Sequence, residues 1–302
     1  MKSIRLGAVL GLIGLASACA EPGADAKSPE NTGKFVYAPS LNVPYQLTMQ
    51  RYEEMSIPGT PVRDAQRWTL TWQVVSSQES NHFKRTLKLV GLQLNVNGVD
   101  DLRGDEIKAS APSIEVLTDK DANVVDVRGT EQLSTAIVGL AAPEVRPVLQ
   151  KVFSPERLKA LVVVRNVEQS ADFIGHPSQV GSQWQVSSPN SASSMQVRVV
   201  AETPCGTRKC VQVARSYDID KQAVFAEVAG RVAEYVQSQG GDPKEVKLTN
   251  AEVKLQDSLV IDPSTMDYYG ASFDQDATIH VTGPNGELPV AFKLHRQSDY
   301  KY

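Results

Sequence analysis

The sequence predicts an α+β fold: one or more large, curved antiparallel β-sheets with a few covering helices, arranged as one domain or as two similar lobes. Two observations predict this class. Apolar and polar residues alternate with a period of two through most of the chain after residue 35, which is typical of half-buried antiparallel strands. Segments with helical periodicity are few and do not alternate regularly with the strands, which argues against a parallel sheet.

The first 18 residues have the three-part layout of a secretory signal peptide. Lys2 and Arg5 form a short positive region, residues 6–15 are apolar apart from glycine, and small residues follow. The apolar run is too short to span a hydrocarbon layer, which takes about 20 residues. We therefore expect this leader to direct export and then to be removed.

A cysteine directly follows the small residues. The run Ala16-Ser17-Ala18-Cys19 resembles the lipobox of bacterial lipoproteins, with Ala at the first position where that family prefers Leu. The resemblance implies cleavage before Cys19, lipid on its sulfur and a fatty acyl group on its new amine. Two or three chains would hold the protein to a membrane stably, since each buried methylene adds about 0.8 kcal/mol. The alternative is an ordinary signal peptide with a chance cysteine.

The lipobox resemblance also implies a location. Ala20 stands where Asp would be the signal for inner-membrane retention in proteobacterial relatives. The expectation is therefore a lipid-anchored protein of the cell envelope, on the outer membrane and facing the periplasm. Residues 19–34 are rich in polar residues, Pro and Gly, which predicts a lipidated flexible tether.

The folded body is expected to run from residue 35 to residue 302. A stretch of Pro, Asn and serines near residues 187–193 interrupts the strand pattern and suggests a boundary. The division would give a first β-rich lobe with a helical layer, residues 35–187, and a second β-rich lobe with one amphipathic helix, residues 188–302. One domain and two lobes both remain open.

Alternation of apolar and polar residues predicts the individual strands. They are Tyr45–Arg51, Trp68–Val74, Val90–Val96, Ile107–Leu117, Val124–Val127, Ser182–Val186, Met195–Ala201, Val211–Tyr217, Val246–Leu248, Val253–Leu259, Ala277–Thr282 and Leu288–Leu294. In the second of these, the even-numbered residues from Trp68 to Val74 share one face. In the third, the even-numbered residues from Val90 to Val96 do so. The Asn285-Gly286 step predicts a tight hairpin between the last two strands.

Four helices are predicted from capping residues and apolar stripes. Thr130 can cap the first, Pro143 can begin the second, and Ser154-Pro155 gives the third a cap with proline at its first position. Asp220 can cap a fourth helix with a long apolar stripe, which ends near Gly240. The first three form one helical layer between two strand-rich halves.

Residues Val124–Trp184 carry a family resemblance. The motifs Val127-Arg128-Gly129, Phe153-Ser154-Pro155-Glu156-Arg157-Leu158 and Pro177-Ser178-Gln179-Val180-Gly181-Ser182-Gln183-Trp184 resemble an uncharacterised family of bacterial envelope proteins. The resemblance covers about a fifth of the chain. It implies a large curved antiparallel sheet with covering helices, a layout similar to that of lipoprotein carriers, and it brings no catalytic residues.

Two cysteines remain after Cys19 is assigned to the anchor. Cys205 and Cys210 flank a predicted hairpin tip between two strands. In an oxidising compartment such a pair is expected to form a disulfide. Redox chemistry uses Cys-x-x-Cys at the start of a helix, which neither this spacing nor this context matches.

Charge and motifs exclude several classes of function. Removal of Lys2 and Arg5 leaves 29 basic against 35 acidic side chains, without a cluster of Lys and Arg, which argues against nucleic-acid binding. Phosphate loops, dinucleotide glycine patterns, nucleophile elbows and metalloprotease helices do not occur in the sequence, so no cofactor is expected.

Three acidic motifs deserve a check as catalytic or metal sites. The first, Asp119–Asn123, imitates a calcium loop but lacks the required Gly and Glu, so a polar hairpin tip is the better interpretation. Asp218 and Asp220, like Asp274 and Asp276, alternate on extended chain, yet such pairs are common in turns. His82, His176, His280 and His295 are scattered, and spacing suggests no third ligand for a metal. We therefore predict neither catalysis nor a metal site.

Two functions remain for an anchored protein of this kind. It can bind a lipid or another hydrophobic ligand in a cleft lined by Trp68, Trp72, Leu92 and Leu94, although a filled core is the favoured interpretation of the same residues. Alternatively, it is a structural or adaptor lipoprotein that acts through contact with an envelope protein.

Overall fold

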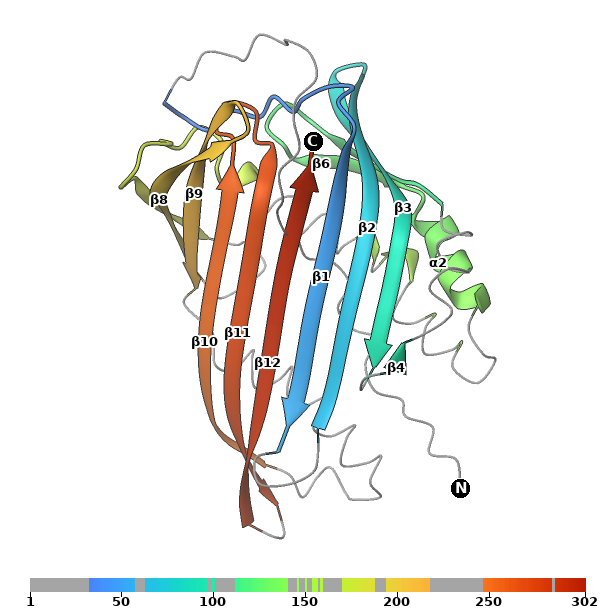
Figure 1. Cartoon of the computed structure of the whole chain (residues 1–302), viewed down its shortest axis with the longest axis vertical. Helices are drawn as coiled ribbons and strands as arrows, with labels where there is room; N and C mark the ends of the chain where they lie inside the picture. The colour runs from blue at the N-terminus through green and yellow to red at the C-terminus, as the bar shows by residue number, and fades with distance from the viewer. Residues whose placement is uncertain are drawn as a thin grey trace.

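The computed structural model describes residues 33–57, 63–96, 99–100, 112–140, 170–187, 194–217, 247–283 and 286–302, with residues 146, 150, 154–156 and 158–159. Within these ranges the chain forms one antiparallel sheet and one α-helix (Figure 1). The described part of the chain is therefore largely β, with less helix than the predicted α+β class implies.

Each half of the chain forms a meander of neighbouring strands. The first half contains β1 (Tyr45–Ser56), β2 (Arg63–Glu79), β3 (His82–Val96), β4 (Val99–Asp100), β5 (Ile114–Thr118), β6 (Val124–Arg128) and helix α2 (Thr130–Leu140). The second half contains β7 (Gln183–Ser187), β8 (Ser194–Cys205), β9 (Arg208–Tyr217), β10 (Lys247–Ile261), β11 (Tyr268–Gly283) and β12 (Gly286–Lys301).

Pairing between the first and last strands joins the two meanders. The order across the sheet is β6-β5-β3-β2-β1-β12-β11-β10-β9-β8-β7, and the short β4 pairs with β3 beside this path. Strands β1 and β12 pair from Gln46↔Lys301 to Ser56↔Ala291. The boundary predicted between residues 187 and 188 separates β7 from β8, which pair with each other in this sheet. The division into two lobes stays a prediction.

The strands are longer than the alternation of apolar residues predicts. Strand β10 unites the two short strands predicted at 246–248 and 253–259, with an irregularity between Leu248 and Asn250. Strand β1 continues past its predicted end at Arg51, where the next inward positions are charged. There Arg51 and Glu53 are both buried and form an ion pair of 2.6 Å. Because these two charges pair, the strand continues through inward positions where an unpaired charged residue would be unfavourable.

One face of the sheet carries the hydrophobic core, and we call it the inner face. Residues from both meanders contribute to one cluster, among them Leu47 of β1, Val74 of β2, Val213 of β9 and Leu259 of β10. Helix α2 adds Leu133 and the segment 170–182 adds Phe173. The sheet curves around these elements (Figure 1). The structure thus shows a single inner face shared by both halves.

A segment before β1 closes one end of this inner face. Residues 33–44, here called the strap, cross the upper end of the sheet in Figure 1. Backbone hydrogen bonds join the strap to the segment 170–182 (Phe35 N to His176 O, 3.0 Å), to the β10–β11 turn (Val36 N to Pro263 O, 2.9 Å) and to β2 (Asn42 N to Ser76 O, 2.7 Å). Phe35 and Tyr37 of the strap are buried in the core.

The helix predicted from the Thr130 cap is confirmed as α2. Gly129, with φ +87°, turns the chain from β6 into the helix, and its carbonyl accepts the Leu133 amide at 3.0 Å. The Leu158 amide donates to the Ser154 carbonyl at 3.0 Å, as expected for the start of the helix predicted there. The helices predicted from Pro143 and from Asp220 lie outside the described residues.

Candidate functional site

The residues predicted to line a hydrophobic cleft lie on two neighbouring strands. Trp72 belongs to the core, where only 7% of its surface is exposed. The register pairs Trp68 with Leu94 and the buried Leu70 with Leu92. The side chains of Trp68, Leu92 and Leu94 lie outside the described part of the structure. For Trp72 the interpretation as filled core describes the structure better.

A β-bulge changes which residues of β3 face inward. Trp72 pairs with Leu89 and Thr71 pairs with Gly91, so Val90 is the extra residue. Val90 is 36% exposed, and its predicted place in a buried row is therefore wrong. Because a bulge shifts the alternation by one residue, the inward residues before it carry odd numbers. These are Phe83, Arg85, Leu87 and Leu89.

An arginine therefore occupies an otherwise apolar row. Phe83 and Leu87, two residues to either side of Arg85, pack against the core cluster. The cross-strand neighbours of Arg85 are Ser76 on β2 and Val116 on β5, and both are buried. The sequence analysis missed Arg85. The signal was a cation at an inward position, which becomes visible only when the bulge is placed.

One donor of the Arg85 guanidinium lacks an acceptor. Its Nε atom is shielded from solvent and has no hydrogen-bond partner. Within the described ranges no carboxylate lies within ion-pair distance of it, although the residue as a whole keeps part of its surface exposed. Burial of a charge without a hydrogen-bonding partner costs free energy. Arg85 therefore marks a place where the inner face is incomplete as a closed core.

Tyrosines gather around this cation at the strap end of the sheet. The ionisable groups that act on Arg85 electrostatically are Tyr45, Tyr37, Tyr302 and Asp267. The ring of Tyr45 lies with its centroid 4.8 Å from that of Tyr302. Tyr37 reaches in from the strap, where its hydroxyl lies 2.8 Å from Thr118 Oγ1. We call these five residues, including the cation, the Arg85 site.

The shifts in pKa at this site have a common origin in burial. Burial raises the pKa of Tyr45 and raises that of Tyr302 well above its ordinary value, so both phenols stay protonated. Burial also raises the pKa of Asp267, which weakens it as a counter-charge. For Arg85 burial opposes the charged form, but the electrostatic effects of Tyr45, Tyr37, Tyr302 and Asp267 outweigh it and raise the pKa. Arg85 is therefore a permanent cation near the protonated phenols of Tyr45 and Tyr302.

Two other inward arginines of the sheet have carboxylate partners. Arg215 of β9 lies 2.7 Å from the carboxylate of Asp257 on β10, which also accepts a hydrogen bond of 2.5 Å from the Tyr217 hydroxyl. Arg51 pairs with Glu53. Buried ion pairs with added hydrogen bonds are a common way to satisfy charge inside a protein. This contrast distinguishes Arg85 from them.

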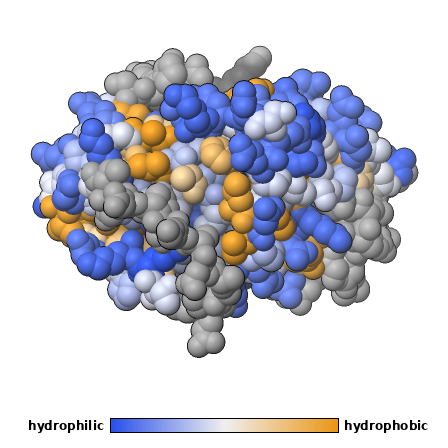
Figure 2. Space-filling model, turned by 90° about the horizontal axis from the view of Figure 1, so that it is seen from above, coloured by the Kyte–Doolittle hydropathy of each residue, from blue (hydrophilic) through white to orange (hydrophobic). Residues whose placement is uncertain are grey.

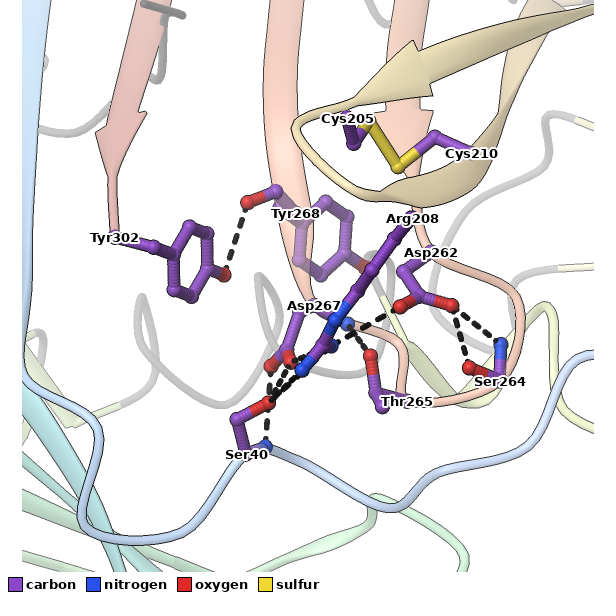
Figure 3. Close-up of polar contacts among 10 residues, drawn as sticks. All are labelled: Ser40, Cys205, Arg208, Cys210, Asp262, Ser264, Thr265, Asp267, Tyr268 and Tyr302. Atoms are coloured by element: carbon purple, nitrogen blue, oxygen red, sulfur yellow. Dashed lines mark hydrogen bonds and ion pairs between the residues drawn. A yellow bond between two sulfur atoms is a disulfide. The ribbon is translucent and has the colours of Figure 1, made fainter. Parts of the chain in front are cut away.

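A second group of charges lies at the rim of the sheet (Figure 3). Arg208, the first residue of β9, contacts Asp262 at 3.1 Å and Asp267 at 3.5 Å, both in the β10–β11 turn. The Ser40 hydroxyl of the strap donates to Asp267 Oδ2 at 2.6 Å. Ser264 donates to Asp262 through its amide and its hydroxyl, at 2.9 and 2.7 Å. These contacts tie the strap to two turns, and we call Ser40, Arg208, Asp262 and Asp267 the rim cluster.

The predicted disulfide is present. Cys205 and Cys210 are joined, with their Cα atoms 5.7 Å apart, at the ends of the strands that carry Arg208 between them (Figure 3). Both cysteines are buried, whereas Gly206 at the tip is exposed and has φ +61°. The bridge thus holds the turn from which Arg208 reaches the rim cluster.

The acidic motifs form ordinary turns and surface pairs. In the turn at Asp119, its carboxylate accepts the amides of Asp121 and Asn123, both at 2.9 Å, as in a polar hairpin tip. Asp274 lies 2.5 Å from the ring of His295 on the neighbouring strand. The Asp218 and Asp220 pair lies outside the described residues. Among the residues that are described, no three His, Cys, Asp or Glu side chains gather as a metal would require.

The leader, Cys19 and most of the tether lie outside the described residues. The expectation of a lipid anchor therefore stays a prediction. In the described part of the chain, no helix combines the length and the apolar character that crossing a membrane takes.

Exposed hydrophobic residues at the strap end are dispersed. Figure 2 views this end of the molecule and shows several separate hydrophobic groups between hydrophilic residues. The exposed large hydrophobic residues of the described ranges are Val36, Leu41, Val90, Val125, Val180 and Val200. Interaction surfaces usually present larger contiguous apolar patches. This face therefore gives the adaptor hypothesis no specific support.

Comparisons with known proteins leave the family open. No protein-family model and no curated protein matches the sequence. Lipovitellin, in a structure of its lipid–protein interactions, is 10% identical with a TM-score of 0.46, over 86% of this chain and 25% of that one. The chain thus spans about a quarter of the lipovitellin chain.

Two further solved structures show weaker likeness. DynF from the dynemicin biosynthesis pathway of Micromonospora chersina is 11% identical over 99% of this chain and 94% of its own, with a TM-score of 0.19. A DUF1329 family protein from Desulfovibrio piger is 6% identical over 85% of each chain, with a TM-score of 0.15. All three TM-scores lie below 0.5, so these likenesses decide neither ligand nor function, and the resemblance of residues 124–184 to an envelope family stays a prediction.

Proposed function

We propose that this chain is an exported envelope lipoprotein, held to the outer membrane through lipid on Cys19, that binds a hydrophobic or amphipathic ligand on the inner face of its sheet. The anchor rests on the leader and on the lipobox-like run that ends at Cys19. The proposal of a bound ligand is based on the structure of the inner face. We propose no catalytic role.

One observation carries the binding proposal. Arg85 is an inward cation in a row of apolar residues, its Nε has no hydrogen-bond partner, and among the described residues no carboxylate lies at ion-pair distance from it as one does from Arg51 and Arg215. A face that serves only as closed core gains stability when such a residue is replaced by an apolar one. A face that receives a ligand can keep it, because the ligand supplies the missing acceptor. The presence of Arg85 at this position therefore supports binding over simple packing.

The architecture supports the same proposal. A single face is shared by both halves of a wide sheet, so an extended ligand could contact strands of both meanders at once. Phe83 and Leu87 on either side of Arg85 are only partly buried and leave apolar surface next to the cation. Ligand sites commonly combine a largely apolar lining with a few polar groups that fix orientation.

Solvent extraction of the full chain separates the two parts of the proposal. The protein is purified from the membranes of its host and extracted with chloroform and methanol, which remove bound lipid and leave covalent lipid in place. Mass spectrometry of the extract should reveal a lipid in stoichiometric amount. The intact mass of the extracted protein should reveal acylation at Cys19. A lipid-free extract beside a stably co-purified protein would favour the adaptor hypothesis. An unmodified thiol at Cys19 would remove the anchor.

A further inference from the structure

We propose that Arg85 binds the anionic group of the ligand, so that the ligand is an amphiphile with a carboxylate or phosphate head and an apolar chain. This inference rests on the proposed function and assigns its ligand a chemical class. It places the head at the strap end of the inner face, in the Arg85 site, and the chain against the partly buried Phe83 and Leu87.

The unmet need at Arg85 is for an acceptor. A guanidinium offers five N–H donors in a planar fork, which matches the oxygens of a carboxylate or phosphate. The Nε donor is shielded from water, so solvent does not satisfy it. Neutral acceptors would meet the hydrogen bond but not the charge, whereas an oxyanion meets both.

The surroundings of Arg85 favour an anion over a cation. Tyr45 is held in its protonated form and can donate a hydrogen bond to an oxyanion, whereas the Tyr302 hydroxyl already donates to the Tyr268 carbonyl at 3.0 Å. Asp267 is the carboxylate that acts on Arg85, but it is already engaged by the Ser40 hydroxyl at 2.6 Å and by Arg208 at 3.5 Å. The Asp267 carboxylate is thus already bound by two groups of the rim cluster.

The apolar neighbours of Arg85 make a free inorganic anion a poor occupant. Phe83 and Leu87 flank the cation on its own strand, and Val116 lies opposite on β5. A ligand that covers these side chains removes apolar surface from water, and each methylene of its chain should strengthen binding about fourfold. The head and the chain are therefore recognised by adjacent parts of one strand.

Binding of four probes to the full chain tests this inference. The probes are oleate, oleyl alcohol, monooleoylglycerol phosphate and inorganic phosphate, each titrated after delipidation and followed by calorimetry. We expect oleate and the phosphate monoester to bind about ten- to a hundredfold more tightly than oleyl alcohol, as a charged hydrogen bond predicts. Inorganic phosphate should not bind at millimolar concentration. If inorganic phosphate binds as tightly as the phosphate monoester, the apolar chain contributes nothing to binding, and the inference that the ligand is an amphiphile is overturned.

Variants on the two faces of β3 assign the preference to one residue. Arg85→Gln should bind oleate and oleyl alcohol equally. Lys88→Gln, which removes the same charge from an exposed position of the same strand, should keep the preference. If Arg85→Gln binds oleate like the parent protein, the inference is overturned while the proposed function stands. If no probe with an oleyl chain binds the parent protein, the proposed function falls too.

A conservative variant guards against misfolding. Arg85→Lys keeps the charge and loses the fork, so it should retain part of the preference for oleate and lose more of the preference for the phosphate monoester. Thermal unfolding of each variant establishes that it is folded before titration. If folded Arg85→Lys loses the preference for oleate as completely as Arg85→Gln does, the charge of residue 85 has no role in binding.

Discussion

The Nη1 atom of Arg208 lies 3.1 Å from Oδ2 of Asp262, across 54 residues of sequence. The same guanidinium lies 3.5 Å from Asp267, and the side chains of both aspartates are at most 6% exposed. A single cation therefore contacts two buried carboxylates and joins the start of β9 to the β10–β11 turn. The integrity of this end of the sheet depends on that relationship.

Substitution of Arg208 by Met should destabilise the fold. It leaves Asp262 and Asp267 buried without their cation, and breaking a buried ion pair costs about 3 kcal/mol. Chemical denaturation of Arg208→Met against the parent protein measures the difference. Lys209→Met, an exposed neighbour, is the matched control and should change the free energy of unfolding by less than about 0.5 kcal/mol. Equal stability of both variants would show that the pair contributes nothing.

Loss of the disulfide should cost less than loss of Arg208. Closing so short a loop restricts the unfolded chain by only about 2 kcal/mol. The double variant Cys205→Ser, Cys210→Ser should therefore lower the free energy of unfolding by about that amount. Because the bridge holds the turn that carries Arg208, combining it with Arg208→Met should cost less than the sum of the two. Strict additivity would mean that the bridge does not position Arg208.

Replacement of Asp267 by Asn should change how stability depends on pH. Burial raises the pKa of Asp267 above its ordinary value of 3.8, so the folded state holds the proton more tightly than the unfolded state. The stabilising contribution is complete below pH 3.8 and is lost as pH rises through the raised pKa. The free energy of unfolding of the parent protein minus that of Asp267→Asn should therefore fall between pH 4 and neutrality. If this difference in the free energy of unfolding rises with pH instead, the pKa of Asp267 is lowered by folding and the prediction is wrong.

Glu79 provides a control of opposite sign. Hydrogen bonds from Lys84 and Arg128 lower the pKa of its carboxyl, so its contribution is present above the ordinary value of 4.5 and is lost as pH falls through the lowered pKa. Relative to Glu79→Gln, the parent protein should gain stability as pH rises from 3 to 5. Urea unfolding at stepped pH values records both slopes under the same conditions.

Gly129 should tolerate no side chain. A Cβ at this position would lie 2.3 Å from the Ser113 carbonyl oxygen, and φ is +87°. Gly129→Ala should therefore cost more than about 2 kcal/mol, through collision as well as backbone strain. Gly181→Ala separates the two causes, since its φ is +91° with open space around, and should cost about 1 kcal/mol. If both variants lose the same free energy of unfolding, the contact between the new Cβ at position 129 and the Ser113 carbonyl contributes nothing.

An apolar residue at position 85 should stabilise the empty protein. The buried Nε of Arg85 lacks a hydrogen-bond partner, so Arg85→Met removes an unsatisfied buried donor and should raise the free energy of unfolding by about 1–3 kcal/mol. The measurement uses delipidated protein, where ligand does not mask the cost. Destabilisation by this variant would mean that Arg85 serves the fold itself.

Local patterns predicted the local features of this fold. Alternation placed Leu70, Trp72 and Val74 on one buried face, and the capping residue Thr130 located α2. Spacing and compartment predicted the bridge from Cys205 to Cys210. Each of these depends on residues near one another in the chain.

Features that depend on distant partners escaped prediction. The bulge at Val90 is set by the register of β3 against β2, and without it Arg85 has no assigned face. The pairing of β1 with β12 and the contact of Arg208 with Asp262 join residues far apart in sequence. The strand predicted at Tyr45–Arg51 continues through Glu53, because the ion pair between Arg51 and Glu53 makes burial of both charges tolerable.

Photocrosslinking tests most directly the central claim that the inner face binds an amphiphile. The delipidated full chain is irradiated with a fatty acid that carries a diazirine in its chain, and the modified residues are located by tandem mass spectrometry. The account predicts labels on inward residues near Arg85, such as Phe83 and Leu87, that excess oleate removes. Labels confined to outward residues such as Val125 and Val200, or unaffected by oleate, would contradict it.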